Sequence, residues 1–137
     1  LVKRFLTPSQ ADQFFDYLEP QDIPAGHSFF AENQATALHF IESGQVDVLL
    51  DLDDGRTKRL QTCASGHILG EMRFYNKVPL SSSVVAVTPC RVYSLSPLAY
   101  AQMQQQAPAL VQALQRHIVE TLCDSLIRRE EQLRVMQ

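Results

Sequence analysis

The chain has 137 residues, of which 45% are hydrophobic and 20% are charged, as expected for one soluble globular domain over residues 1–137. Its net charge of −3 and its pI of about 5.7 give no basic surface field, which argues against direct contact with nucleic acid. No run approaches the roughly 18 apolar residues that a membrane-spanning helix needs.

The first predicted element is a helix over residues 7–19. Thr7 can cap it, Pro8 suits its first turn, and Gln10 completes a capping box with Thr7. Pro20 ends the helix, because proline cannot continue the hydrogen-bond ladder.

Residues 20–95 have the pattern of β-structure. Apolar and polar residues alternate at 38–40 and 46–52, which is the period of half-buried strands. Asp53-Asp54-Gly55 predicts a hairpin turn after the second of these runs. We expect about eight short antiparallel strands. The predicted fold is therefore mainly β with flanking helices: a double-stranded β-helix, or jelly roll, with one helix before it and two after.

Two helices are predicted over residues 96–136. Ser96 caps the first, and Pro108 begins the second, which should be on the order of 40 Å long. The apolar stripe of the second helix comprises Leu110, Leu114, Ile118, Leu122 and Leu126. This apolar stripe is wider than the surface that the helix needs for packing against its own domain. We therefore predict a homodimer through Leu114, Ile118 and Leu122. Packing back onto its own domain is the alternative.

Residues 66–86 contain the candidate ligand site. Gly70 allows backbone to approach a ligand closely, because it has no Cβ. A short helical turn follows it, and the unpaired N–H groups of such a turn can hold an anion. Glu71 opens that turn, and its carboxylate is suited to accept hydrogen bonds from hydroxyl groups. An anion-binding turn beside a carboxylate that accepts hydrogen bonds from hydroxyl groups indicates that the ligand is a sugar phosphate.

This segment resembles the phosphate-binding cassette of the cyclic-nucleotide-binding domain family. Gly70-Glu71-Met72, Pro79 and Val84-Val85-Ala86 match its pattern, and the likeness covers most of the chain from about Thr7, so it implies the β-roll fold. In the family, the glutamate takes the ribose 2′-hydroxyl and an arginine grips the cyclic phosphate. In this chain Leu80 stands at the position of that arginine. Ser81 and Ser82 stand at the positions of the Ser-Ala pair that follows it.

The replacement by Leu80 predicts weak binding or none to cyclic AMP and cyclic GMP. A phosphate in a half-buried pocket needs a charge-assisted partner, which arginine supplies and leucine cannot. Arg73 stands where the family has a small residue. The Arg73 side chain either points into the anion-binding position of the cassette or faces solvent. In the first case it would bind a different small anion or fill the pocket itself.

The sequence contains no pattern typical of catalysis or of metal binding. The serines at 81–83 have no recognisable His-Asp partners, and the four histidines lack the spacing of a zinc site. We therefore expect a non-catalytic sensor domain with no catalytic residues, no metal and no resident cofactor.

The parent protein is predicted from shorter resemblances. Three short segments resemble the C-terminal tail of bacterial SulP-type sulfate permeases: Arg4-Phe5-Leu6-Thr7, the run from Gly70 to Tyr75, and Pro108-x-Leu110 with the later pair Arg128-Arg129. The main alternative is the ligand-sensing N-terminal domain of a catabolite-activator-like transcription regulator. The regulatory domain of a channel or a kinase is a further alternative. The chain starts at Leu1 and not at methionine, so we expect a piece of a longer protein. Three scattered cysteines predict a cytoplasmic location, which includes the cytosolic tail of an inner-membrane protein.

Overall fold

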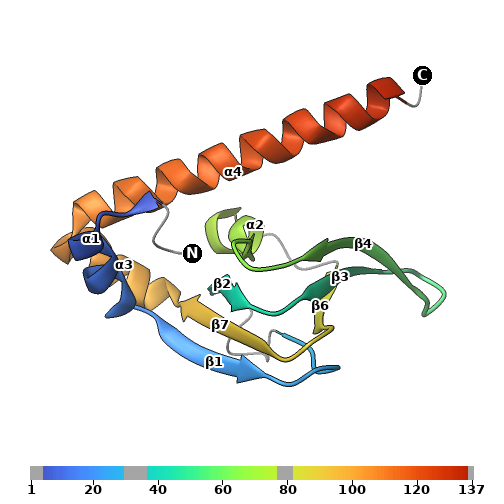
Figure 1. Ribbon diagram of the computed structural model, residues 1–137, viewed down its shortest axis with the longest axis horizontal. Helices are drawn as coiled ribbons and strands as arrows, with labels where there is room; N and C mark the ends of the chain where they lie inside the picture. The colour runs from blue at the N-terminus through green and yellow to red at the C-terminus, as the bar shows by residue number, and fades with distance from the viewer. Residues whose placement is uncertain (1–4, 30–36, 77–81, 136–137) are drawn as a thin grey trace.

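The computed structural model describes residues 5–29, 37–76 and 82–135, and within that part of the chain two antiparallel sheets are packed with helices at one side (Figure 1). The strands are β1 Glu19–Ile23, β2 Leu38–Ser43, β3 Val46–Asp51, β4 Thr57–Cys63, β5 Ile68–Leu69, β6 Ser82–Ala86 and β7 Cys90–Leu95. The helices are α1 Pro8–Phe15, α2 Glu71–Asn76, α3 Pro97–Gln106 and α4 Pro108–Val135. This arrangement confirms the predicted mainly-β roll with flanking helices.

The two sheets enclose the first part of the core. One sheet has the strand order β1-β7-β2-β5, and the other has the order β4-β3-β6. The hairpin predicted at Asp53-Asp54-Gly55 joins β3 to β4, and Gly55 there has a φ of +83°. The side chains between the sheets are apolar: Ile23, Phe29, Ile41, Val46, Cys63, Leu69, Val84, Ala86, Cys90 and Val92.

Helix α1 begins as predicted and ends earlier than predicted. The Thr7 hydroxyl accepts from the Gln10 amide at 3.2 Å, and the Gln10 side chain accepts from the Thr7 amide at 3.1 Å. The last helical residue is Phe15, whereas the sequence predicted a helix over 7–19. The chain turns extended because Glu19 pairs with Ser94 in β7, and Pro20 is tolerated in β1 because β1 is an edge strand.

The helices build a second core on the outer face of the β1-β7-β2-β5 sheet. Ser96 caps α3 by accepting from the Ala99 amide at 3.1 Å, as predicted. The residues of this outer cluster come from α1 and the segments on either side of it, from β2 and β7, and from the three other helices: Leu6, Ala11, Phe14, Leu18, Leu38, Phe40, Phe74, Leu95, Met103, Leu110, Val111, Leu114 and Ile118.

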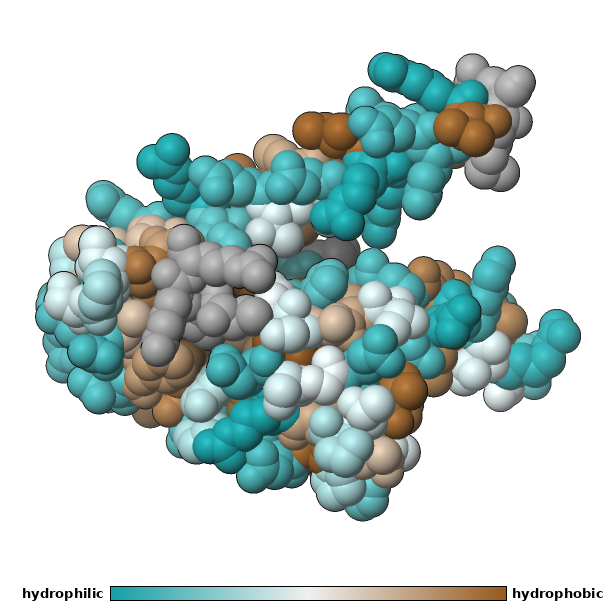
Figure 2. Space-filling view, in the orientation of Figure 1, coloured by the Kyte–Doolittle hydropathy of each residue, from teal (hydrophilic) through white to brown (hydrophobic). Residues whose placement is uncertain are grey.

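The first half of α4 packs on its own domain, and this corrects the predicted dimer face. Leu114 is fully buried and Ile118 is 5% exposed, both in the outer cluster, so neither is available to a second copy. Of the three predicted interface residues, Leu122 is the one left exposed. Beyond it α4 diverges from the β-roll (Figures 1 and 2). Within the described part of the chain, no helix has both the length and the apolar character of a membrane span.

Candidate functional site

The predicted cassette turn is built by β5, Gly70 and α2. Gly70 has a φ of +87°, and a Cβ there would lie 2.9 Å from the Ala37 carbonyl oxygen, so a larger residue would strain the turn. The Phe74 amide donates to the Gly70 carbonyl oxygen at 2.9 Å. The Phe74 side chain is buried in the outer cluster and fixes the turn to the helical layer.

Glu71 is the first residue of α2, and one of its two carboxylate oxygens has no partner among the described residues. Its Oε2 atom is buried, and no hydrogen-bond partner for it is found among the described residues. Burial raises the pKa of Glu71, and a hydrogen bond from its own backbone amide opposes part of that rise. A buried acceptor without a partner is destabilising until a donor from a ligand reaches it.

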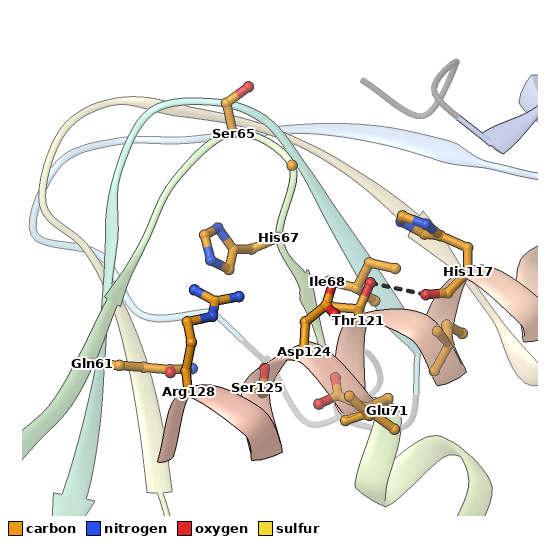
Figure 3. Close-up of a pocket in the computed structure, with 13 residues that line it drawn as sticks. Gln61, Ser65, His67, Ile68, Glu71, His117, Thr121, Asp124, Ser125 and Arg128 are labelled. Atoms are coloured by element: carbon orange, nitrogen blue, oxygen red, sulfur yellow. Dashed lines mark hydrogen bonds between the residues drawn. The ribbon is translucent and has the colours of Figure 1, made fainter. Parts of the chain in front are cut away.

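Glu71 lies in the wall of a cavity of about 340 Å³ between the β-roll and α4 (Figure 3). The β-roll supplies the end of β4 and the loop into β5, and α4 supplies the opposite wall. The space-filling view shows a hollow between α4 and the β-roll (Figure 2). The lining residues are Gln61, Ser65, Gly66, His67, Ile68, Glu71, His117, Ile118, Thr121, Leu122, Asp124, Ser125 and Arg128.

The α4 wall of the cavity is polar, and the sequence reasoning missed it. Thr121, Ser125 and Arg128 recur at helical spacing on the side of α4 that faces the β-roll. The Thr121 hydroxyl donates to the His117 carbonyl oxygen at 2.9 Å. A polar stripe beside the apolar one was the available signal. This stripe did not predict a cavity wall, because many helices carry such residues on the side that faces solvent.

His117 marks the end of the cavity where α4 rests on the N-terminal segment. Its ring stacks on Phe5 with centroids 4.3 Å apart and planes 8° apart. Burial lowers the pKa of His117, while the nearby Glu120 carboxylate opposes that change. The neutral ring therefore fits this contact, which helps to hold α4 beside the cavity.

The other predicted site residues are only partly covered by the structure. Leu80 and Ser81 lie outside the described residues. Met72, Arg73 and Ser82 fall within α2 and β6, but their side chains are outside what the structure describes. The orientation predicted for Arg73 therefore stays a prediction.

The comparisons with known proteins agree with this architecture. The sequence pattern of the cyclic nucleotide-binding domain matches residues 20–107. The chain belongs to the cyclic nucleotide-binding domain family. A solved cyclic nucleotide-binding domain from Methylobacillus flagellatus superposes with a TM-score of 0.81 at 22% identity, covering 90% of this chain and 70% of that one, which shows the shared fold.

Two of the curated relatives are regulators of different kinds. A CRP-like cAMP-activated global transcriptional regulator of Mycobacterium tuberculosis is 28% identical over 84% of this chain and 52% of its own length. A cAMP-dependent protein kinase regulatory subunit of Colletotrichum orbiculare is 29% identical over 72% of this chain and 25% of its own length. The chain thus spans about half or less of the length of these relatives.

Glu71→Gln is expected to stabilise the ligand-free domain at neutral pH by about 1 kcal/mol. Because burial raises the pKa of Glu71, the folded state favours the protonated acid. The stability that this protonation supplies is complete below the ordinary pKa of 4.5 and is lost as pH rises through the raised value. The neutral amide avoids that loss, so the difference in melting temperature should grow from about pH 4 to about pH 8.

Glu130→Gln is the control, because it removes the same charge from an exposed position on α4. It should change the melting temperature little at either pH. A Glu71→Gln protein that is no more stable than the wild type at about pH 8 would show that the carboxylate is well solvated or paired.

Proposed function

We propose that this chain is a non-catalytic regulatory domain that binds a small ligand in the cavity between the β-roll and α4. The observation that carries the proposal is Glu71: the residue lines this cavity, and its buried Oε2 atom has no partner among the described residues. The regulators among the relatives support a sensing role. Gly70 and Glu71 would position the hydroxyl groups of the ligand.

Cyclic nucleotides are proposed to bind weakly or not at all. The family pattern implies an arginine for the cyclic phosphate, and this chain has Leu80 there. Losing a charge-assisted contact to a phosphate costs a few kcal/mol, which is roughly a hundredfold in affinity.

Calorimetric titration of the purified domain with cyclic AMP and cyclic GMP tests this proposal. We expect dissociation constants weaker than about 100 μM for both. Micromolar or tighter binding by the wild-type domain would contradict the proposed loss of the phosphate contact.

For the parent protein, we propose a SulP-type sulfate or anion transporter, with this domain as its cytosolic C-terminal part. The proposal rests on the short resemblances at Arg4-Phe5-Leu6-Thr7, the cassette and Arg128-Arg129. The similarity to the mycobacterial regulator favours the second candidate, the N-terminal sensor of a transcription regulator. The full-length gene distinguishes them: about ten or more apolar spans upstream indicate the transporter, and a helix-turn-helix segment downstream indicates the regulator.

A homodimer through the second half of α4 is also proposed. The exposed apolar residues Val119, Leu122, Leu126 and Leu133 follow one another at spacings of three, four and seven. This is the spacing of a coiled-coil seam, with Arg129 at the one intervening seam position. Leu126 is 60% exposed and Leu133 is 62% exposed, and a second copy of α4 would cover them.

A further inference from the structure

Arg128 lines the cavity from α4, and no ion-pair partner for it is found among the described residues. Arg56, Arg91 and Arg116 each pair with a carboxylate, respectively Asp54, Asp22 and Glu120. No such pair is found for Arg128 in the part of the chain that the structure describes, although its side chain is part of the cavity wall. A cation that faces a cavity without a carboxylate partner is able to bind an anion there.

The orientation of Arg128 supports this function. Asp124 lies one helical turn earlier, where it could pair with Arg128. Figure 3 shows instead that the guanidinium is directed toward His67 of the β-roll, and that Gln61 lies beside the base of the same side chain. The amide of Gln61 and the ring of His67 are further groups that can donate hydrogen bonds to an oxyanion.

The cavity therefore has two chemically different ends. Glu71 lies at the base of α2 and accepts hydrogen bonds, whereas Arg128 projects from α4 and donates them (Figure 3). A ligand that satisfies both ends carries hydroxyl groups on one side and an anionic group on the other. A cavity of about 340 Å³ is large enough for a ligand the size of a nucleoside monophosphate.

We infer that Arg128 is the anion-binding residue of this domain, and that the ligand is a nucleoside monophosphate or a sugar phosphate of similar size. This inference rests on the proposed function, because it uses the same cavity. The sugar hydroxyls bind at Glu71, and the phosphate binds to Arg128. The cationic contact thus comes from α4 and not from position 80 of the cassette.

The position of the phosphate distinguishes open-chain from cyclic nucleotides. In cyclic AMP the phosphate is fused to the ribose, so a ribose held by Glu71 keeps the phosphate near the cassette, whose sequence has leucine at position 80 where the family pattern has arginine. A 5′-phosphate turns about single bonds, extends away from the ribose and carries a charge of about −1.5 to −2 near neutral pH. It can therefore reach Arg128, and its higher charge strengthens the contact.

Binding at Arg128 also links the ligand to α4. A ligand held by both Glu71 and Arg128 contacts the β-roll and the extending half of α4 at once. It therefore stabilises the arrangement in which these two elements enclose the cavity, by an amount set by its affinity for that arrangement.

The test compares Arg128→Gln with Arg129→Gln, since both remove one positive charge from neighbouring exposed positions and Arg129 does not line the cavity. Each protein is titrated by calorimetry with 5′-AMP, adenosine, inorganic phosphate and cyclic AMP. We expect the wild type to bind 5′-AMP at least tenfold more tightly than the other three probes. Arg128→Gln should weaken 5′-AMP binding at least tenfold, and Arg129→Gln should change it less than about twofold.

The outcomes separate this inference from the proposed function. Equal binding of 5′-AMP by the two variants overturns the role of Arg128 and leaves a ligand-binding domain. Phosphate alone binding as tightly as 5′-AMP overturns the nucleotide class of the ligand. A wild type that binds none of the probes overturns the inference. A double variant, Leu80→Arg with Ser82→Ala, then tests the proposed function, because it restores the phosphate contact of the family pattern. If this variant binds cyclic AMP, the cavity is a ligand site and the proposed function still stands. If the double variant does not bind cyclic AMP either, both the inference about Arg128 and the proposed function are rejected.

Discussion

Replacing Leu80 with arginine and Ser82 with alanine is expected to raise the affinity of the domain for cyclic AMP by about a hundredfold or more. The double change supplies the guanidinium and the Ser-Ala pair that the family pattern implies for the cassette. A planar guanidinium can donate two parallel hydrogen bonds to the phosphate, which leucine cannot do. Gly70 and Glu71 need no change, because the turn and the acceptor are already formed.

Glu71→Ala on the doubly substituted background is the decisive control. The cyclic phosphate and the ribose hydroxyl are held together, so removing the acceptor should lose most of the gained affinity. Leu80→Lys with Ser82→Ala should recover less binding than the arginine version, because an ammonium group cannot form the bidentate contact. A double variant that stays silent to cyclic AMP, yet melts at the wild-type temperature, would show that the pocket is closed by other side chains.

Replacing Ile118 with aspartate is expected to destabilise the domain by about 3–5 kcal/mol. Ile118 is 5% exposed in the outer cluster, where it packs with the helical layer and β2. An aspartate there removes the apolar contacts and buries a carboxylate. Circular dichroism should show a large fall in the melting temperature, or an unfolded protein at room temperature.

Leu126→Asp is the matched change on the same helix, and it separates packing from assembly. Leu126 is 60% exposed, so aspartate there should leave the melting curve of the monomer nearly unchanged. If the exposed seam joins two copies, light scattering should show a dimer for the wild type and a monomer for Leu126→Asp. A wild-type monomer at tens of micromolar, or an unchanged mass for Leu126→Asp, counts against the dimer.

Local chemistry allowed much of the fold to be predicted. The capping box of Thr7 and Gln10, the cap at Ser96 and the turn at Gly55 each depend on residues within a few positions of one another. Such signals act through backbone geometry and one or two hydrogen bonds, so they can be recognised from the sequence alone. The end of α1 was predicted wrongly, because it is decided by the pairing of Glu19 with Ser94, far away in the chain.

The candidate site divides in the same way. The sequence determined the turn at Gly70 and the presence of Glu71 at the start of α2, since both are local. Only the tertiary structure showed that the Glu71 oxygen is buried and that Glu71 lines a cavity together with residues of α4. The same tertiary structure brings Arg128 into the cavity that Glu71 lines.

Helix α4 shows what the sequence by itself could not decide. Its apolar residues at spacings of three and four identify a helix with an apolar face, and this holds whichever surface covers that face. The outer cluster buries Leu114 and Ile118, whereas Leu122 and Leu126 are exposed where α4 runs apart from the β-roll. The sequence therefore determined the elements and their caps, while the fold decided which side chains became core, cavity wall or exposed seam. That assignment depends on contacts between residues far apart in the chain, which no local pattern records.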